Sequence, residues 1–344
     1  MRSQLAAVVV LNWNGLEDTR ECIRSLASQT YGERAIWIVD NASAHGEADS
    51  LEREFTSAIR LLRSATNLGF AGGCNLAISR ILAEGKASYI ALLNNDAVAD
   101  PRWLEALVNG LQSVPTAAAA TSRMVFYDSP ETIENTGICV LTNGDAVPRG
   151  RGEPARRWNR SGPVLGACGG AALWRAEVLE KIGLFRSDFF ANFEDVDLAL
   201  RSRALGYECL YVADSIARHR LSVSVKKARD DAFDTRSLKK LTLAYCINMP
   251  LAVILLNLPW LVLCNLFVIL VAPVFGQSRV ARLWLRGRVL AWRERATIRA
   301  ERRRLAPLRR GSALALWWQQ RSFFFSYWRF FWEGVVLRRR RFME

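Results

Sequence analysis

The fold of this chain is limited most strongly by a regular alternation of strand-like and helix-like segments over the first 125 residues. Continuous aliphatic runs, typical of strands buried on both faces of a parallel sheet, alternate with segments whose apolar residues recur at helical spacing. The expected strands are Leu5–Asn12, Ala35–Asp40, Ile59–Arg63 and Tyr89–Leu93. The expected helices are Leu16–Gln29, Glu47–Phe55, Cys74–Glu84 and Arg102–Ser113. This order predicts an α/β fold with a mixed, mostly parallel sheet flanked by helices.

The pattern loosens between Met124 and Gly162, where Gly, Pro and Arg are frequent, and we expect a surface loop or hairpin there. Further elements are expected beyond it. They are a small-residue strand at Gly166–Leu173, helices at Glu177–Ile182 and from Glu194 to about Leu205, and two short strands at Cys209–Val212 and Ile216–Leu221.

Polar side chains gather where the expected strands end. These residues are Asn12 and Asn14, Asp40 and Asn41, Asn67, and Asn94-Asn95-Asp96. In an open α/β sheet the ligand binds beyond the carboxyl ends of the strands. The sequence therefore predicts one ligand site at that edge of the sheet.

The net positive charge of the chain lies entirely in its last part. Residues 241–344 hold 18 Arg, no Lys and four acidic residues, which accounts for the net charge of +14. The same segment holds seven of the 12 Trp. We therefore expect two parts, an α/β domain over residues 1–240 and a helical, Arg- and Trp-rich region that associates with a membrane over residues 241–344.

An uncharged run of 38 residues, Leu241–Ser278, opens this second part. Its segment Leu251–Phe275 is almost wholly apolar and exceeds the roughly 20 residues that a spanning helix needs. Pro259 interrupts it, so the sequence allows one kinked spanning helix or two half-helices that enter the membrane and return. Arg-rich segments with Trp follow, ending at 338–341. They predict a helix that lies in the interface of an anionic leaflet. By the positive-inside rule, that side of the membrane faces the cytoplasm. A nucleic-acid-binding tail is the alternative, but it leaves the uncharged run unexplained.

The cysteines and the N-terminal segment point to the same compartment. Seven Cys at irregular spacing, with no CxxC pair, disfavour a disulfide framework and favour reduced, buried thiols. Leu5–Leu11 ends without a small-residue cleavage site and is expected to be a first strand rather than a secretory signal. The expected location is the cytoplasmic face of the inner or plasma membrane.

Three groups of residues could carry chemistry. Asp96, at a strand end beside amide oxygens, suits Mg²⁺ or Mn²⁺, although turn chemistry explains it equally. The acids of Glu194-Asp195-Val196-Asp197 could include a general base, or simply complement a helix N-terminus. His219 is a candidate metal ligand, because its arginine neighbours are expected to keep the imidazole neutral.

Five motifs occur together in one order and resemble a known family. They are Val8-Val9-Val10-Leu11-Asn12-Trp13-Asn14-Gly15, Asp40-Asn41-Ala42-Ser43, Asn67-Leu68-Gly69-Phe70-Ala71-Gly72-Gly73-Cys74-Asn75, Leu92-Leu93-Asn94-Asn95-Asp96 and Phe193-Glu194-Asp195-Val196-Asp197-Leu198. This set resembles glycosyltransferase family 2, in its rhamnosyltransferase-like branch, over about residues 5–225. The resemblance implies a GT-A fold, a nucleotide-sugar donor, a divalent metal and inversion at the anomeric carbon.

The resemblance also implies roles for individual residues. Asp195 matches the catalytic base, with Glu194 beside it, and Asp96 and His219 match the metal ligands. Asn94 stands where the family motif has its first Asp, which implies a weaker metal site. The donor-binding positions are Asn12, Asn14, Asp40, Asn41, Asn67, Gly69, Gly72, Asn75 and Asn95.

The expected function follows from this resemblance. It is transfer of a sugar from a dTDP- or UDP-linked donor to a lipid-linked or polysaccharide acceptor, in cell-wall or polysaccharide biosynthesis. Rhamnose is favoured by the resemblance, and hexoses remain open. The alternatives are a nucleotidyltransferase, a non-catalytic membrane-bound nucleotide-sugar sensor and a nucleic-acid-binding protein. A nucleotidyltransferase would normally have a Gly-rich, basic phosphate loop near the N-terminus, and Asn12–Gly15 is not such a loop. We expect no nucleic-acid partner.

Overall fold

The chain folds into two compact units. The structure is a computed structural model that describes residues 4–221, 230–320 and 332. The first unit comprises residues 4–138, 148–202 and 207–221, and the second comprises residues 139–147, 203–206, 230–320 and 332. We call them the sheet unit and the helical unit. The domain boundary that we expected after residue 240 falls within α8 (Asp231–Asn248). The division into a domain over residues 1–240 and a region over residues 241–344 stays a prediction.

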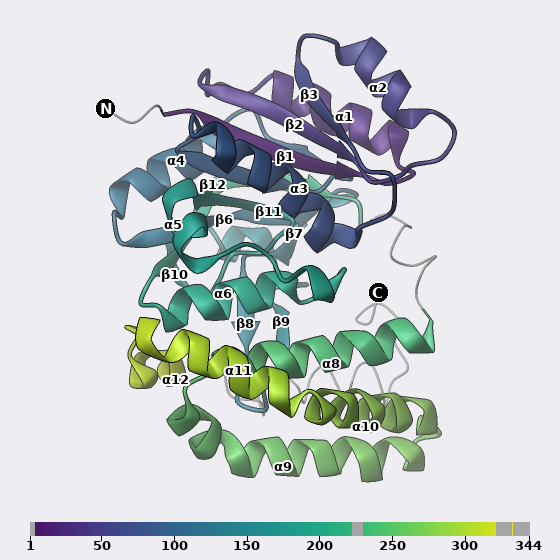
Figure 1. The fold of residues 1–344 in the computed structure, drawn as a ribbon, viewed down its shortest axis with the longest axis vertical. Helices are drawn as coiled ribbons and strands as arrows, with labels where there is room; N and C mark the ends of the chain where they lie inside the picture. Colours follow the sequence, from purple (N-terminus) through teal and green to yellow (C-terminus); the bar gives the residue numbers. More distant parts are fainter. Residues whose placement is uncertain (1–3, 222–229, 321–331, 333–344) are drawn as a thin grey trace. The chain divides into compact units, whose positions relative to one another are not determined.

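A mixed sheet forms the centre of the sheet unit (Figure 1). Its strands are β1 (Ala6–Asn12), β2 (Arg34–Asp40), β3 (Ile59–Arg63), β4 (Tyr89–Leu93), β5 (Ala97–Ala99), β6 (Ala117–Phe126), β7 (Ser129–Asn135), β10 (Gly162–Val164), β11 (Ala171–Arg175) and β12 (Glu208–His219). Their order is β10-β12-β6-β11-β4-β1-β2-β3, with β5 paired to β12 and β7 to β6. Strands β3, β2, β1 and β4 are parallel, and so are β6 and β12. Strand β11 is antiparallel to both of its neighbours.

Helices pack on this sheet through their apolar faces. They are α1 (Leu16–Ala27), α2 (Glu47–Phe55), α3 (Gly69–Glu84), α4 (Trp103–Ser113), α5 (Ala176–Ile182) and α6 (Glu194–Ala204), with 3₁₀ turns η1 (Ala155–Arg157) and η2 (Ser187–Phe189). Strand β1 is fully buried from Ala6 to Val10, as its aliphatic run predicts. Trp103 is also fully buried, and its indole N–H donates to Ser122 Oγ at 2.7 Å. The expected α/β fold with a mostly parallel sheet is confirmed.

Several predicted boundaries were wrong. Helix α3 begins at Gly69, five residues before the expected start, because the Phe190 carbonyl accepts from Ala71 N and so caps the first turn. Strand β11 covers only Ala171–Arg175, and the preceding glycines form a loop. The two strands expected near the end of the sheet unit are one strand, β12, with an irregularity between Val212 and Ile216.

The segment 124–162, expected to be a surface loop or hairpin, contains a hairpin, because β6 and β7 pair antiparallel across a short turn. Strand β6 begins within an alanine run, Ala117–Ala120, that sequence propensity does not mark as a strand. It forms because β11 and β12 pair with it on either side. Strand β7 pairs with β6, and β8 (Ile138–Val140) pairs with β9 (Ala146–Pro148) in a separate two-stranded sheet.

The helical unit contains α8, α9 (Leu251–Val274), α10 (Ser278–Arg293), α11 (Arg295–Leu305), the 3₁₀ turn η3 (Ala306–Leu308) and α12 (Ala313–Gln319). They are drawn green to yellow in Figure 1. Helix α9 is continuous through Pro259, so the apolar segment does not form two half-helices. The arginine run at 338–341 lies outside the described residues.

Two arginines of the tail have a structural role inside the helical unit. Arg302 donates to the carbonyl oxygens of Cys246 and Met249 at 2.6 and 2.8 Å. Arg309 donates to those of Ile247 and Asn248 at 3.0 and 2.7 Å. The carbonyls of Cys246, Ile247 and Asn248 lie in the last turn of α8, and that of Met249 follows directly. The end of a helix leaves such carbonyls without partners inside the helix, so the guanidinium groups satisfy them and complement the helix dipole.

Candidate active site

Asn12 is the centre of the first polar cluster. It ends β1 and is fully buried. Its Nδ2 donates to Asp40 Oδ1, Ser43 Oγ and Glu47 Oε2 at 3.0–3.1 Å, and its Oδ1 accepts from Thr19 Oγ1 at 2.7 Å. Asn12 therefore holds together the loops that follow β1 and β2, and it positions the Asp40 carboxylate at the edge of the sheet.

Asn41 organises the neighbouring cluster in the same way. It is buried, and its Nδ2 donates to Asn67 Oδ1 at 2.9 Å and to the Gly69 carbonyl at 3.2 Å. Its Oδ1 accepts from Leu68 N at 2.9 Å. Gly69 has φ +68°, and a Cβ there would lie 2.4 Å from the Phe190 carbonyl, so this position requires glycine. The predicted residues Asn41, Asn67 and Gly69 therefore meet at the start of α3.

The third cluster brings Asp96 and His219 together, as the sequence predicted. His219 Nε2 lies 3.0 Å from Asp96 Oδ1 and 3.2 Å from Asn94 Nδ2. Glu134 of β7 approaches the other ring nitrogen, with Oε2 3.6 Å from Nδ1. Asp96, Glu134 and His219 are all buried. Sequence reasoning missed Glu134, because it lies in the segment expected to be a loop or hairpin, whose strand pairing the sequence does not specify.

The expectation that arginine neighbours keep His219 neutral was wrong. Burial alone would lower the pKa of His219, but the carboxylates of Asp96 and Glu134 overcome that effect and raise it to about 10. The neighbouring Arg220 instead forms ion pairs with Asp18 and Glu21. His219 therefore carries a proton in this arrangement, and a cation at Nε2 would have to displace it.

The ligand atoms of Asp96 and His219 fit a divalent cation. Two neighbouring ligands of an octahedral ion, each at about 2.1 Å, are about 3.0 Å apart, which matches the separation of Asp96 Oδ1 and His219 Nε2. Glu134 faces the opposite side of the ring and does not converge on the same point. Within the described ranges, accordingly, no three acidic, His or Cys side chains converge as a metal site.

Asp195 lies at the start of α6, half-buried. Its Oδ2 accepts from Gly169 N at 3.0 Å and its Oδ1 accepts from Val196 N at 2.8 Å. Burial raises the pKa of Asp195 above its usual value, although these backbone hydrogen bonds oppose the shift. A raised pKa makes a carboxylate a better proton acceptor near neutral pH.

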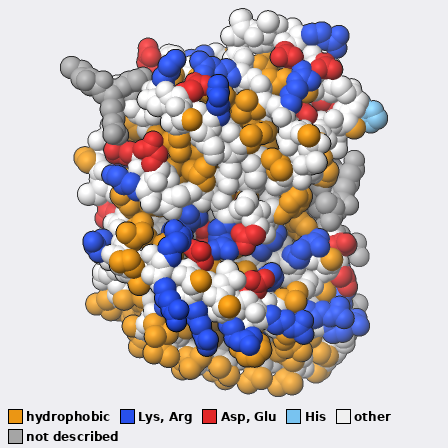
Figure 2. All heavy atoms as spheres, in the orientation of Figure 1, with side chains coloured by type: hydrophobic (Ala, Val, Ile, Leu, Met, Phe, Trp, Pro, Cys, Tyr) orange, Lys and Arg blue, Asp and Glu red, His pale blue; other side chains and the backbone are white. Residues whose placement is uncertain are grey.

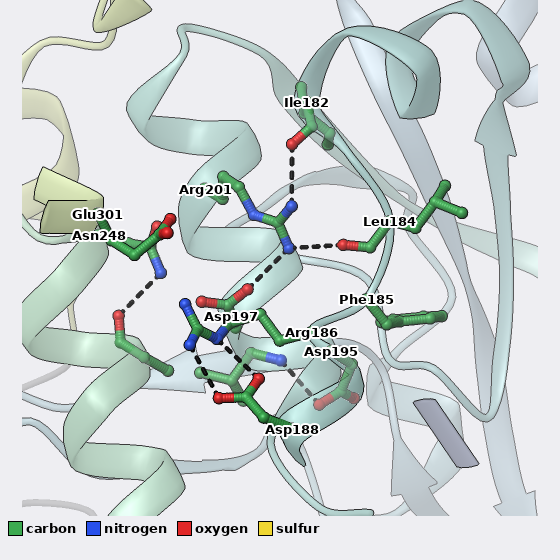
Figure 3. A network of polar contacts seen from close by, with 12 residues as sticks. Ile182, Leu184, Phe185, Arg186, Asp188, Asp195, Asp197, Arg201, Asn248 and Glu301 are labelled. Carbon is green, nitrogen blue, oxygen red and sulfur yellow. Dashed lines mark hydrogen bonds and ion pairs between the residues drawn. The ribbon is translucent and has the colours of Figure 1, made fainter. Parts of the chain in front are cut away.

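The other acids of this segment differ in surroundings. Asp197 is almost fully buried and forms an ion pair with Arg201 at 2.7 Å (Figure 3). Arg201 also donates to the carbonyls of Ile182 and Leu184 at 2.9 and 2.8 Å. Asp197 and Arg201 therefore fix α6 to the loop after α5. Glu194, which precedes Asp195 in the sequence, is buried.

The loop that leads into Asp195 has an unusual backbone. Phe190, Asn192 and Phe193 have φ of +58°, +70° and +66°. Bulky residues rarely adopt this region, and each costs about 1–3 kcal/mol. Such strain gathers at functional sites, where the surrounding structure enforces it. Here the Phe190 carbonyl, held by Ala71 N at 3.0 Å, ties the loop to the start of α3.

Hydrogen bonds join the Asn12 cluster, the Asp96–His219 cluster and Asp195 into one group. Asn95 Nδ2 donates to Thr19 Oγ1 at 3.0 Å, which links the Asn12 cluster to the end of β4. Asn94 N donates to the Gly170 carbonyl at 2.9 Å, and the adjacent Gly169 contacts Asp195. We call this group the strand-edge network: Asn12, Thr19, Asp40, Asn94, Asn95, Asp96, Gly169, Gly170, Asp195 and His219.

Three predicted donor-binding residues, Asn14, Gly72 and Asn75, are not among the residues of this network. Asn14 is exposed, has φ +53°, and accepts from Ala44 N at 2.8 Å. Asn75 instead pairs with the backbone of Phe185, with hydrogen bonds of 2.8 and 3.1 Å. Gly72 lies in the first turns of α3. Sequence reasoning missed Thr19 and the Gly169–Gly170 pair, although two adjacent glycines before a strand were a usable signal of a close backbone approach.

Two relatives resemble this chain in sequence. The chain is 29% identical over 222 residues to the O-antigen biosynthesis protein RfbC of Myxococcus xanthus, covering 60% of this chain and 16% of RfbC. It is 26% identical over 208 residues to the low-salt glycan biosynthesis hexosyltransferase Agl10 of Haloferax volcanii, covering 57% of this chain and 61% of Agl10. The similarity thus spans less than two thirds of either relative.

A solved structure shares the fold. GalNAc-T7 with UDP, GalNAc and Mn²⁺ has a TM-score of 0.58 and 12% identity, over 71% of this chain and 48% of that one. The fold of the sheet unit is thus the GT-A fold, as expected. Residues 7–183, just over half of the chain, match the sequence model of "Glycosyl transferase family 2". The chain belongs to this family.

Proposed function

We propose that the chain is an inverting, metal-dependent glycosyltransferase that moves a sugar from a nucleoside-diphosphate donor to a lipid-linked or polysaccharide acceptor. The observation that carries this proposal is the strand-edge network. It joins a carboxylate suited to nucleotide contact, Asp40, to a cation-binding pair, Asp96 and His219, and to a base, Asp195. Nucleotide recognition, leaving-group stabilisation and proton transfer are the three tasks that this reaction requires.

Asp195 is the proposed general base. The acceptor hydroxyl oxygen attacks the anomeric carbon from the face opposite the diphosphate, and its proton passes to an Asp195 carboxylate oxygen. The bond between the anomeric carbon and the diphosphate oxygen breaks, and the nucleoside diphosphate leaves. Gly169 N and Val196 N hold the carboxylate in place for this transfer. One displacement inverts the anomeric configuration, with no covalent enzyme intermediate.

Asp96 and His219 are the residues proposed to hold the divalent cation, Mn²⁺ or Mg²⁺. When bound, this cation neutralises the developing charge of the diphosphate leaving group. The structure of GalNAc-T7 contains Mn²⁺, which supports this assignment.

The donor is proposed to be a dTDP- or UDP-sugar. Asp40 and the asparagines around it supply the carboxylate and amide groups that hydrogen-bond a base and ribose, and the UDP in GalNAc-T7 supports this class of donor. Rhamnose is the sugar that we propose from the sequence resemblance. The relatives act in O-antigen and glycan biosynthesis, which supports a role in assembling a cell-surface polysaccharide.

The proposed location is the cytoplasmic face of the membrane, where lipid-linked acceptors are elongated. Of the described helices, α9 is the one long and apolar enough to cross a membrane. The arginines of α10 and α11 supply positive charge close to it in the sequence. Anionic headgroups attract such segments.

Donor hydrolysis by the purified chain tests the reaction. A panel of UDP-, dTDP- and GDP-sugars is incubated with Mn²⁺, with and without EDTA, and nucleotide release is measured. The proposal expects slow, EDTA-sensitive release from one class of donor, which increases when membrane lipid extract supplies an acceptor. Release that EDTA leaves unchanged would contradict the metal assignment.

A non-catalytic nucleotide-sugar sensor is the second candidate. It shares the donor-binding residues and requires no base. If the chain binds a UDP- or dTDP-sugar but releases no nucleotide with any lipid extract, the sensor is favoured over the transferase.

A further inference from the structure

Helix α9 is fixed to the helical unit by a buried polar group at its first half. Asn257 is only 1% exposed. Its Nδ2 donates to Tyr245 Oη at 2.9 Å and to Gln320 Oε1 at 2.7 Å, and its Oδ1 accepts from Trp317 Nε1 at 3.1 Å. Gln320 in turn donates to the Leu141 carbonyl at 3.2 Å. These contacts join α9 to α8 and to the end of α12.

The second half of α9 is held along the same stripe. Asn265 Oδ1 accepts from Trp284 Nε1 of α10 at 2.7 Å. The buried positions Val253, Asn257, Cys264, Val268 and Ala272 are four or seven residues apart, so they share one face of the helix. One narrow stripe of α9 therefore packs against protein over nearly its whole length.

The remaining surface of α9 is apolar and exposed. Leu255, Leu263 and Leu270 are 58%, 56% and 65% exposed, and Val274 is 80% exposed. Figure 2 shows hydrophobic side chains gathered along the edge of the helical unit where α9 lies, beside a row of Lys and Arg side chains. An exposed apolar face of this length marks an interaction surface.

The positions of the α10 arginines distinguish an α9 that spans a bilayer from one that lies in its plane. Because Trp284 contacts Asn265, and only a short turn joins the two helices, α10 runs back alongside α9. Arg286, two residues after Trp284, is exposed opposite the middle of α9, and Arg293 is exposed further along. If α9 crossed the bilayer, these charged groups would lie within the hydrocarbon, where arginine is strongly disfavoured. If α9 lies in the plane, the same groups reach the headgroups.

We propose that α9 lies in the plane of the membrane, inserted into one leaflet, with the α10 arginines at anionic headgroups. The exposed Trp292 and Trp318 belong at the same boundary, where indole rings are enriched. A second copy of this chain is a poorer occupant, because a two-fold contact through α9 would bring the two arginine rows together. This inference rests on the proposed membrane partner and not on the proposed reaction. Vesicle flotation and spin-label depth therefore test it without a sugar donor.

Vesicle flotation of the full chain tests the surface. Phosphatidylcholine vesicles are compared with vesicles that also contain phosphatidylglycerol, and we expect at least tenfold stronger binding to the latter. The double variant Leu255→Glu/Leu263→Glu should lose at least tenfold in binding, whereas Ala83→Glu, an exposed position of α3, should bind normally. Arg282→Glu/Arg286→Glu should lose the preference for phosphatidylglycerol, and Arg80→Glu should keep it. A stable dimer that binds no vesicles would overturn the proposal.

Insertion depth separates the in-plane helix from a spanning one. Spin labels are placed at Leu255→Cys, Leu263→Cys and Leu270→Cys, with the unsubstituted chain as background because its seven cysteines are buried or half-buried. An in-plane α9 gives equal depths within one leaflet. In a spanning helix, the label at 263 would be about 10 Å deeper than the other two, given a rise of 1.5 Å per residue, and that result would overturn the proposal.

Discussion

The sheet unit and the helical unit distribute polar and apolar side chains in opposite ways. In the sheet unit, aliphatic residues fill the interior, and the polar groups gather at the carboxyl edge of the strands. In the helical unit, Asn257 and its partners lie inside, and leucines of α9 cover the outside. The first arrangement suits a polar ligand in water. The second suits an apolar surrounding, because it satisfies its hydrogen bonds internally.

Each unit also has a buried polar centre, and the two centres differ in charge. Asp197 and Arg201 form an ion pair in the sheet unit, while Asn257, Tyr245 and Gln320 form a neutral group in the helical unit. Removing one partner of a buried ion pair leaves a charge in a poorly solvated place, whereas breaking a neutral group leaves only unpaired dipoles. The ionic centre should therefore be the more sensitive of the two.

The largest expected effect on stability comes from Arg201→Met. It leaves the Asp197 carboxylate buried without its partner, and the free energy of unfolding should fall by about 3–5 kcal/mol. Urea unfolding measures this loss. Arg63→Met, which breaks exposed ion pairs with Asp49 and Glu52, is the control and should cost about 0–1 kcal/mol. Equal losses for the two variants would contradict the structural role of Asp197 and Arg201.

Asn257→Leu should follow, with a loss of about 2–3 kcal/mol. It leaves the Tyr245 hydroxyl, the Trp317 indole N–H and the Gln320 amide without one partner each. Thermal unfolding in detergent gives the change, and Leu256→Ala on the exposed face of α9 serves as the control with little expected effect. If Asn257→Leu were as stable as the unsubstituted chain, the neutral centre would not be holding α9.

Glu134→Gln should weaken Mn²⁺ binding by about tenfold, since carboxylates that support a metal-binding histidine typically contribute a factor of 10–100. The removed charge lies 3.6 Å from His219 Nδ1. Calorimetric titration with Mn²⁺ alone measures the affinity without a donor. Glu131→Gln, at an exposed position of the same strand, should bind Mn²⁺ normally. The assignment of His219 as a ligand is wrong if both variants bind equally well.

The smallest effect concerns pH. Asp195 must be deprotonated to accept a proton, and burial raises its pKa, so activity should fall as pH decreases through a value above the usual 3.8 of an aspartate. The folded state also holds this proton more tightly than the unfolded state, so Asp195 destabilises the fold increasingly as pH rises through that window. A kcat profile and nucleotide binding are measured together, and binding should change less than kcat. An acid limb at or below 3.8 would contradict the raised pKa.

Much of the fold could be predicted because local pattern and tertiary structure agree. Strands β3 and β4 and helix α2 have the predicted bounds, since their apolar periodicity and flanking turns are unambiguous. Strand β6 could not be predicted, because the alanines of its first half favour helices and only pairing with β11 and β12 makes them a strand.

The site was predicted in part for a similar reason. The juxtaposition of Asp96 and His219 was expected because the family resemblance matches both positions to ligands of one metal. Glu134 could not be found, since its approach to His219 depends on how β7 folds back on β6. The charge of His219 was wrongly expected because sequence shows the arginines beside it but not the carboxylates across from it. Contacts between segments more than 80 residues apart decide such details.

In the proposed reaction, the strand-edge network performs glycosyl transfer with Asp195 as base. The first measurement is the kcat of sugar transfer and the donor affinity of Asp195→Asn. The control is Asp214→Asn, at an exposed position of β12. We expect kcat to fall by about 10²–10⁴-fold for Asp195→Asn with donor affinity nearly unchanged, and neither quantity to change for Asp214→Asn. An Asp195→Asn variant that transfers sugar at the rate of the unsubstituted chain would contradict this expectation.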